Sequence, residues 1–259
     1  MNKDIPVVIL CGGLGTRLSE HTEVRPKPMV EIGGRPILWH IMKHYAHYGF
    51  NEFFLALGYK GEQIKRYFLE YYSLARDFTI TLGNGQIKTL NHNNIEPWQI
   101  HLVDTGQTSF TGGRLKTLEP LISKGTFMMT YGDGVSNVNL NELLSFHHAQ
   151  GGLVTLTAVR PPARFGALKF NGHQIRNFKE KSTLDEGWIN GGFFIIEPSA
   201  LSYIKEDVMW EHAPMENLAK EGQLYAYQHN GFWQCMDTLR ELKYLESLWD
   251  NGNPPWKTW

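Results

Sequence analysis

The sequence predicts a Rossmann-like α/β protein, in which helices flank a mostly parallel sheet and a smaller antiparallel portion follows. Three observations predict this fold. Short apolar runs alternate with helix-length amphipathic segments through the first 160 residues, as expected for a parallel sheet covered on both faces. A Gly-rich loop follows the first apolar run, where open α/β sheets bind their ligands. Beyond residue 160, an Asn-Gly pair between two short strand-like runs signals a hairpin.

The elements of the first part follow from their periodicities. Val7–Cys11 is predicted to be a buried strand because it is apolar throughout. Pro36–Tyr48 is predicted to be a helix, since Pro36 suits a first turn, apolar residues recur on one face and Gly49 can end it. The other predicted elements here are strands Phe53–Leu57, Phe78–Leu82, Ile100–Val103, Phe127–Tyr131 and Leu153–Val159, and helices Glu62–Tyr72 and Asn139–Gln150.

The last hundred residues show a different pattern. Ala167–Phe170 and Gln174–Phe178 flank Asn171-Gly172 and are predicted to form a hairpin. We assign these and the following elements to an antiparallel portion without an obvious linker before it. We therefore expect one domain over residues 1–259, with an α/β core in 1–160 and a second portion in 161–259. The remaining predicted elements are strands Gly192–Ile196 and Leu224–Gln228, and helices Pro214–Glu221 and Thr238–Trp249.

The composition limits which binding partners and which cellular compartment we expect. The 259 residues are 42% hydrophobic and 20% charged, which is ordinary for a globular protein, and the net charge of -1 argues against a nucleic-acid partner. Cys11 and Cys235 form neither a CxxC motif nor a disulfide framework, which is typical of a reducing compartment. The first apolar run is too short for a signal peptide or a membrane span. We expect a cytoplasmic protein with no membrane partner.

The loop after the first strand is the most informative stretch, and it runs Leu10-Cys11-Gly12-Gly13-Leu14-Gly15-Thr16-Arg17. Its glycines let backbone N–H groups approach an anion closely, and the planar fork of Arg17 suits phosphate oxygens. The loop lacks the Gly-Lys-Ser/Thr ending of a P-loop, and Leu18 stands where a dinucleotide fingerprint needs its third glycine. A tight turn without a ligand is the alternative.

A lysine and two aspartates add a possible phosphate and metal site. Lys27 lies between Pro26 and Pro28, which hold it on a stiff, extended segment suited to aiming its ammonium. Asp133 is flanked by glycines at the end of an apolar strand, and Asp237 precedes a helix. Magnesium is usually held by one or two carboxylates together with substrate phosphates. A turn aspartate and a helix N-cap are the alternatives.

The two loop motifs together resemble the signature of the sugar-1-phosphate nucleotidyltransferases. The likeness covers nearly the whole chain, and within the family it is strongest to members that use CTP and glucose 1-phosphate. The preference for CTP is implied by the resemblance alone. The residues that carry it, besides Gly12-Gly13-x-Gly15-Thr16-Arg17-Leu18 and Pro26-Lys27-Pro28-Met29, include Thr111-Gly112-Gly113-Arg114-Leu115, Tyr131-Gly132-Asp133-Gly134, Arg164-Phe165-Gly166, Ile189-Asn190-Gly191-Gly192, Met236-Asp237-Thr238 and Pro255-Trp256-Lys257-Thr258-Trp259.

The resemblance implies a role for each candidate residue. Asp133 and Asp237 would hold Mg²⁺, Lys27 would bridge the reacting phosphates, and Arg17 would hold the departing pyrophosphate. A homo-oligomer is implied as well, with residues 1–160 mainly binding nucleotide and 161–259 mainly binding sugar. The implied nucleotide contacts are Leu10, Cys11, Gly12, Gly13, Leu14, Gly15, Thr16, Arg17, Lys27, Thr108, Gly113 and Gly132, and the implied sugar contacts are Gly166, Glu180, Lys181 and Asn190.

Three other functions stay open at this point. The same chemistry with dTTP, UTP or GTP is the first, and a non-catalytic regulatory protein that binds nucleotide sugars is the second. A dinucleotide-dependent enzyme is the third, and the incomplete glycine fingerprint argues against it. A histidine metal site is not expected, because no carboxylate or cysteine completes a ligand set near His44 and His47 or near His147-His148.

Overall fold

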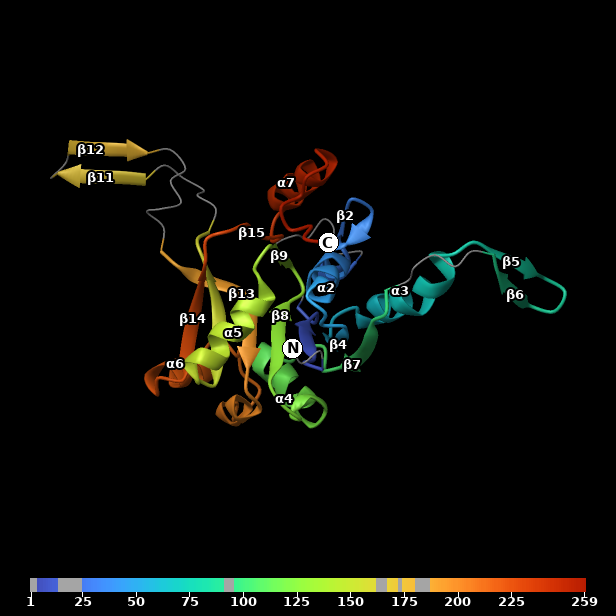
Figure 1. The fold of residues 1–259 in the computed structure, drawn as a ribbon, viewed down its shortest axis with the longest axis horizontal. Helices are drawn as coiled ribbons and strands as arrows, with labels where there is room; N and C mark the ends of the chain where they lie inside the picture. The colour runs from blue at the N-terminus through green and yellow to red at the C-terminus, as the bar shows by residue number, and fades with distance from the viewer. Residues whose placement is uncertain (1–3, 14–24, 91–95, 162–166, 172–173, 180–186) are drawn as a thin grey trace.

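The structure, a computed structural model, describes residues 4–13, 25–90, 96–161, 167–171, 174–179 and 187–259. Its centre is a seven-stranded sheet with the strand order β14-β10-β13-β8-β1-β4-β7 (Figure 1). The predicted α/β class is confirmed. The strands of this sheet are β1 (Val7–Leu10), β4 (Glu52–Leu57), β7 (Gln99–Asp104), β8 (Phe127–Tyr131), β10 (Val154–Val159), β13 (Ile189–Ile196) and β14 (Leu224–His229).

The sheet is mostly parallel, but its composition differs from the prediction. β8, β1, β4 and β7 pair in parallel, and so do β10 and β14. β13 lies between β10 and β8 and runs antiparallel to both. We predicted that Gly192–Ile196 and Leu224–Gln228 belong to a separate antiparallel portion, and this was wrong, because both join the central sheet. The physical reason is burial: residues 191–196 of β13 are buried, as an interior strand requires.

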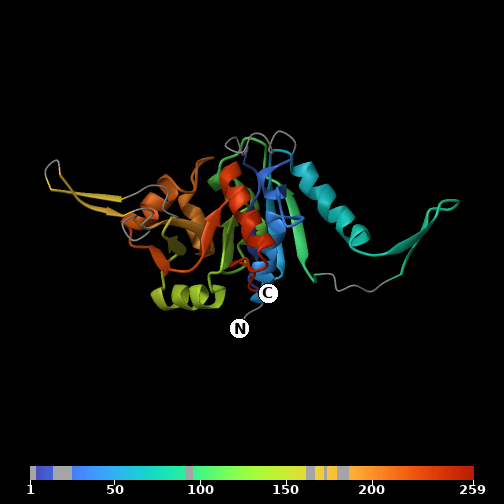
Figure 2. The ribbon, with the colours of Figure 1, turned by 90° about the horizontal axis from the view of Figure 1, so that it is seen from above.

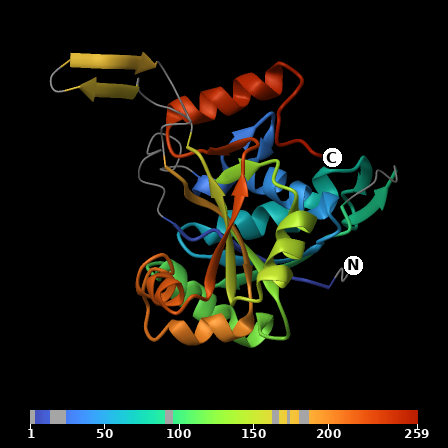
Figure 3. The same ribbon diagram turned by 60° about the vertical axis from the view of Figure 1, so that its left-hand side comes forward.

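Helices cover both faces of the sheet. Val7 and Ile9 of β1 belong to the core on the face of α2, α3, α5 and α7, whereas Val8 and Leu10 belong to the core on the face of α4 and α6, as the two-residue period of a strand dictates. Figure 3 shows α7 on one side of the sheet and α4 with α6 on the other. The helices are α2 (Ile37–His47), α3 (Gly61–Leu74), α4 (Thr111–Ile122), α5 (Leu140–Gln150), α6 (Ala213–Lys220) and α7 (Leu239–Asp250), with short 3₁₀ helices η2 (Lys27–Met29) and η4 (Pro198–Tyr203).

Two hairpins project from the body of the molecule (Figures 1 and 2). The predicted strand Phe78–Leu82 is confirmed as β5 (Phe78–Thr81), but it pairs with β6 (Gln86–Thr89) outside the central sheet. The predicted hairpin near residue 171 is confirmed as β11 (Ala167–Asn171) and β12 (Gln174–Lys179). The two other strand pairs are β2 (Glu31–Ile32) with β3 (Arg35–Pro36), and β9 (Gly134–Ser136) with β15 (Trp233–Cys235).

Side-chain caps begin two of the described helices, α5 and α7. The Asn139 side chain accepts the backbone N–H groups of Asn141 and Glu142 at the start of α5. Thr238 and Glu241 form a capping box at the start of α7. Among the residues that the structure describes, no helix combines the length and the apolar character needed to span a membrane.

Two histidines of α2 are buried in the core. His40 donates from Nε2 to the carbonyl oxygen of Ile32 at 2.9 Å and accepts the indole N–H of Trp256 at 3.4 Å. Burial lowers the pKa of His40 to about 4 and that of His44 to about 3. Both imidazoles are therefore neutral in the folded protein at neutral pH.

These histidines make the folded state sensitive to acid. The unfolded chain binds protons at a histidine below about pH 6.5, whereas the folded chain does not until about pH 4 for His40. The free energy of unfolding is therefore expected to fall as the pH drops from about 6.5 toward 4, by about 1.4 kcal/mol per pH unit for each buried histidine. Urea unfolding of His40→Gln across this window should show a slope shallower by about that amount. His148→Gln, at an exposed position, is the control, and an unchanged slope in His40→Gln would contradict the assignment.

Candidate active site

A cavity of about 500 Å³ opens at the carboxyl ends of the parallel strands. The loops that leave β1, β7 and β8 form its walls, as expected for an open α/β sheet. Glycines, polar side chains and apolar side chains from segments far apart in the sequence line it. The lining residues are Leu10, Cys11, Gly12, Gly13, Lys27, Pro28, Gln107, Thr108, Ser109, Phe110, Thr111, Arg114, Tyr131, Gly132, Asp133 and Met209.

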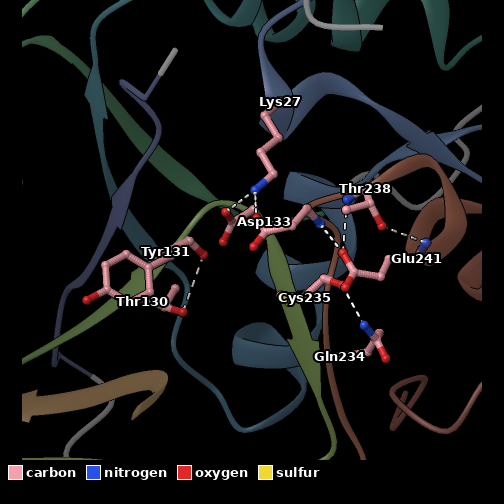
Figure 4. Close-up of polar contacts among 9 residues, drawn as sticks. Lys27, Thr130, Tyr131, Asp133, Gln234, Cys235, Thr238 and Glu241 are labelled. Carbon is pink, nitrogen blue, oxygen red and sulfur yellow. Dashed lines mark hydrogen bonds and ion pairs between the residues drawn. The ribbon is translucent and has the colours of Figure 1, made fainter. Parts of the chain in front are cut away.

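Lys27 and Asp133 line this cavity, and Asp237 meets them at its edge. The Lys27 ammonium donates to Asp133 Oδ2 at 2.5 Å and also to Asp237 Oδ1, and Figure 4 shows the lysine side chain extending to Asp133. Each residue is held by its own element: Lys27 begins η2, Asp133 lies between β8 and β9, and Asp237 lies between β15 and α7. The backbone N–H of Met236 donates to the carbonyl oxygen of Asp133 at 2.8 Å and joins the two aspartate loops.

The electrostatics of the trio keep the lysine charged. The Lys27 side chain is 12% exposed, and burial by itself lowers the pKa of an ammonium. The negative charge of Asp133 and the hydrogen bonds to both aspartates outweigh that effect and raise the pKa of Lys27 above its usual value. The site thus holds a fixed positive charge between two carboxylates.

The same two carboxylates fit a divalent metal with a preference for oxygen. Asp133 and Asp237 converge closely enough to share one cation, the Lys27 ammonium. Within the described part of the chain, no group of three or more His, Cys, Asp or Glu side chains could hold a metal ion. A metal bound by the two aspartates would complete its coordination with substrate phosphates and water, as Mg²⁺ usually does.

A second cavity of about 220 Å³ adjoins the first. The two cavities share Tyr131 and Asp133, so Asp133 faces both. Asn190, predicted from the resemblance to contact sugar, lines the second cavity together with Asp237. The remaining lining residues are Thr130, Gly134, Gly191, Gly192, Phe193, Trp233 and Cys235.

Arg114 ties the loops of the first cavity together. Its guanidinium is buried and donates to the carbonyl oxygens of Gly12 at 3.0 Å, Leu57 at 3.0 Å and Gly106 at 2.7 Å. A Cβ atom at position 12 would lie 2.2 Å from the guanidinium carbon, so this position needs glycine. The sequence offered one signal for such a role, an arginine in the first turn of a helix, where the helix dipole disfavours a cation.

The structure brings most, but not all, of the described candidates together. Leu10, Cys11, Gly12, Gly13, Lys27, Thr108, Gly132 and Asp133 line the first cavity, and Asp133, Asn190 and Asp237 line the second. The described lining of the two cavities does not include Gly113, which lies against Asp207. The candidates that lie outside the described residues are Leu14, Gly15, Thr16, Arg17, Gly166, Glu180 and Lys181.

Both cysteines near the site are free thiols. Burial raises the pKa of Cys11 far above its usual value and that of Cys235 to about 12. Because the thiolate is the nucleophilic form, neither side chain is suited to attack phosphorus. Cys11 packs instead as a small apolar residue at the end of β1.

The chain resembles known proteins over most of its length. Residues 6–239 match the family described as Nucleotidyl transferase. The glucose-1-phosphate cytidylyltransferase of Salmonella typhimurium is 50% identical over 254 residues, which cover 97% of this chain and 98% of the relative. The probable glucose-1-phosphate cytidylyltransferase of Bacillus subtilis is 44% identical over 254 residues, or 97% of this chain and 99% of the relative.

Solved structures share the fold. HddC from Yersinia pseudotuberculosis superposes with a TM-score of 0.67 at 20% identity, covering 95% of this chain and 99% of that one. A UDP-glucose pyrophosphorylase in complex with UDP-glucose superposes with a TM-score of 0.67 at 16% identity, covering 95% of this chain and 98% of that one. The predicted fold is therefore confirmed by comparison as well as by topology.

Proposed function

The chain belongs to the nucleotidyl transferase family, and from this premise we propose that it transfers the cytidylyl group of CTP to α-D-glucose 1-phosphate, giving CDP-glucose and pyrophosphate. Relatives that are 44% and 50% identical over 97% of the chain carry the name of that activity. The observation that carries the proposal is the meeting of Lys27, Asp133 and Asp237 where two cavities join. A nucleotide fits the larger cavity at the Gly-rich loop, and a sugar phosphate fits the smaller one.

The reaction needs no general base. A sugar 1-phosphate is largely dianionic near neutral pH, because the second pKa of a phosphomonoester is about 6. One of its oxygens attacks the α-phosphorus of CTP, and the bond from that phosphorus to the oxygen bridging toward the β-phosphate breaks. Pyrophosphate leaves without a covalent enzyme intermediate. Positioning and electrostatic stabilisation are then the main contributions of the protein.

Each residue of the site has a part in that displacement. The backbone at Gly12 and Gly13 lies against the triphosphate, and the Lys27 ammonium offsets the negative charge where the two phosphates meet. Asp133 and Asp237 would hold Mg²⁺, which supplies charge neutralisation and Lewis acidity when bound. Family members generally use a divalent metal, and the paired carboxylates suit Mg²⁺.

Further assignments complete the proposal. Leu10, Cys11, Thr108 and Gly132 contact the nucleotide, and Asn190 contacts the sugar. Leu14, Gly15, Thr16 and Arg17 extend the phosphate loop, and Gly113 contacts the base. Gly166 and Glu180 contact the sugar, and the Lys181 ammonium holds its phosphate. The whole chain, 1–259, acts as one nucleotidyltransferase domain, with nucleotide binding mainly in 1–160 and sugar binding mainly in 161–259. The protein is a cytoplasmic homo-oligomer.

Pyrophosphate release tests the proposed function directly. The protein is incubated with glucose 1-phosphate, Mg²⁺ and one triphosphate at a time, chosen from CTP, UTP, dTTP, ATP and GTP. Release is expected with CTP alone. Release with another triphosphate would keep the mechanism and overturn the base preference. If no triphosphate gave pyrophosphate release while circular dichroism showed a folded protein, the result would contradict the proposed reaction. It would favour a regulatory protein that binds nucleotide sugars.

A further inference from the structure

The Glu211 carboxylate connects the two cavities without lining either of them in the described structure. The Tyr131 hydroxyl donates to Glu211 Oε1, and the Thr111 hydroxyl donates to Oε2 at 2.6 Å. Thr111 begins α4 and lines the first cavity, whereas Tyr131 ends β8 and lines both. The Glu211 carboxylate thus accepts two hydroxyl hydrogen bonds, one from a residue of the first cavity and one from a residue that both cavities share.

Glu211 fixes the direction of the hydrogen bonds that reach the second cavity. An ionised carboxylate only accepts hydrogen bonds, so the Tyr131 hydroxyl must turn its proton toward Glu211. The tyrosine oxygen is left as an acceptor, and Asn190 Nδ2 donates to it at 3.4 Å. At the other end of the amide, Asn190 Oδ1 accepts the backbone N–H of Gly192 at 2.8 Å. The amide orientation is therefore defined at both ends.

This arrangement sets what a ligand meets in the second cavity. Asn190 offers its second Nδ2 proton, which suits an acceptor oxygen, and the Tyr131 hydroxyl offers its second lone pair, which suits a hydroxyl donor. A sugar presents both kinds of group.

The start of α4, beside the first cavity, is held in place independently of Glu211. The Thr111 hydroxyl oxygen also accepts the backbone N–H of Trp210 at 2.8 Å. The backbone N–H of Gly112 donates to the carbonyl oxygen of Val208 at 2.9 Å. Loss of the glutamate would therefore leave the start of α4 held by these two hydrogen bonds, while Tyr131 would lose its acceptor.

We propose that Glu211 is a positioning residue for the sugar phosphate: by accepting from Tyr131, it fixes the hydrogen-bond direction of Tyr131 and Asn190 toward that substrate. This inference rests on the proposed function, since it concerns the sugar side of the same site. The glutamate does not touch the reacting atoms. It acts through Tyr131, whose hydroxyl links it to Asn190.

Steady-state kinetics on four variants test the proposal. Glu211→Ala and Tyr131→Phe are each expected to raise the KM for glucose 1-phosphate about tenfold, the effect of losing one buried hydrogen bond, with the KM for CTP within about twofold of the unmodified enzyme. The double variant should be no worse than either single one, because both remove the same link. Glu211→Gln should restore most of the affinity, because its amide oxygen can still accept from Tyr131.

A second tyrosine–glutamate pair provides the matched control. The Tyr203 hydroxyl donates to Glu221 on the surface, and Glu221→Ala is expected to leave both KM values unchanged. An unchanged KM for glucose 1-phosphate in Tyr131→Phe would overturn the proposal, even if Glu211→Ala failed to fold. The proposal would also be overturned if the increases in the KM for glucose 1-phosphate multiplied in the double variant, because Glu211 would then act independently of the Tyr131 hydroxyl. Absence of CDP-glucose with the unmodified enzyme would instead contradict the proposed function.

Discussion

Replacing Asp133 with asparagine is expected to lower kcat by about a thousandfold. Asp133 faces both cavities and pairs with Lys27, so the substitution removes a carboxylate where metal, nucleotide and sugar phosphate would meet. Asparagine preserves the shape, and the side chain is 32% exposed, so the fold should persist. Pyrophosphate release at saturating substrates measures kcat, and a series of MgCl₂ concentrations should show half-maximal activity shifted to higher metal.

A distant aspartate separates this effect from a general loss of charge. Asp250→Asn, at the exposed end of α7, changes the net charge by the same amount and is expected to keep the unmodified kcat. Circular dichroism of both variants checks folding. If Asp133→Asn kept the unmodified kcat and the unmodified metal dependence, Asp133 would not hold the catalytic metal.

Replacing Lys27 with methionine is expected to lower kcat by about a hundredfold or more, because the positive charge that offsets the repelling phosphates is lost. Methionine retains much of the length of the side chain. Asp133 and Asp237 then face each other without the ammonium, so metal binding should stabilise this variant more than the unmodified protein. Thermal unfolding with and without MgCl₂ measures that difference.

The control for Lys27 is a lysine that serves no site. Lys220→Met, at an exposed position near the end of α6, should leave both kcat and the response of the melting temperature to MgCl₂ unchanged. A Lys27→Met variant with the unmodified kcat would contradict the proposed role. A normal response to metal together with a low kcat would limit that role to the reacting phosphates.

Sequence pattern alone predicted the elements whose burial is uniform. Val7–Leu10 and Phe127–Tyr131 are apolar runs that lie side by side in the sheet, and the family resemblance seen in the Gly-rich loop is confirmed. Pattern did not predict which sheet a strand joins. β5 alternates Phe78 and Ile80 with two threonines, as a half-buried strand would, yet all four of its residues are exposed, because nothing in a short run specifies the partner strand.

For the candidate site too, sequence pattern predicted some features and not others. Flanking prolines and glycines marked Lys27 and Asp133 as unusual, but their meeting with Asp237 depends on three loops that only the folded sheet brings together. Arg114 and Glu211 act through residues about 100 and 80 positions away in the sequence, so no local pattern could reveal their partners. Arg114 at least left the signal of a cation at a helix start, whereas Glu211 left none.

The bonds of Arg114 have a consequence for how nucleobase preference changes in evolution and in engineering. One guanidinium joins the loop after β1, the end of β4 and the loop after β7, so these three segments are not independent modules. A graft of residues 105–110 from a relative with a different base preference keeps its geometry only if position 114 remains arginine and position 12 remains glycine. Substitutions in the loop after β7 and in the loop after β1 are therefore expected to be inherited together, as one unit.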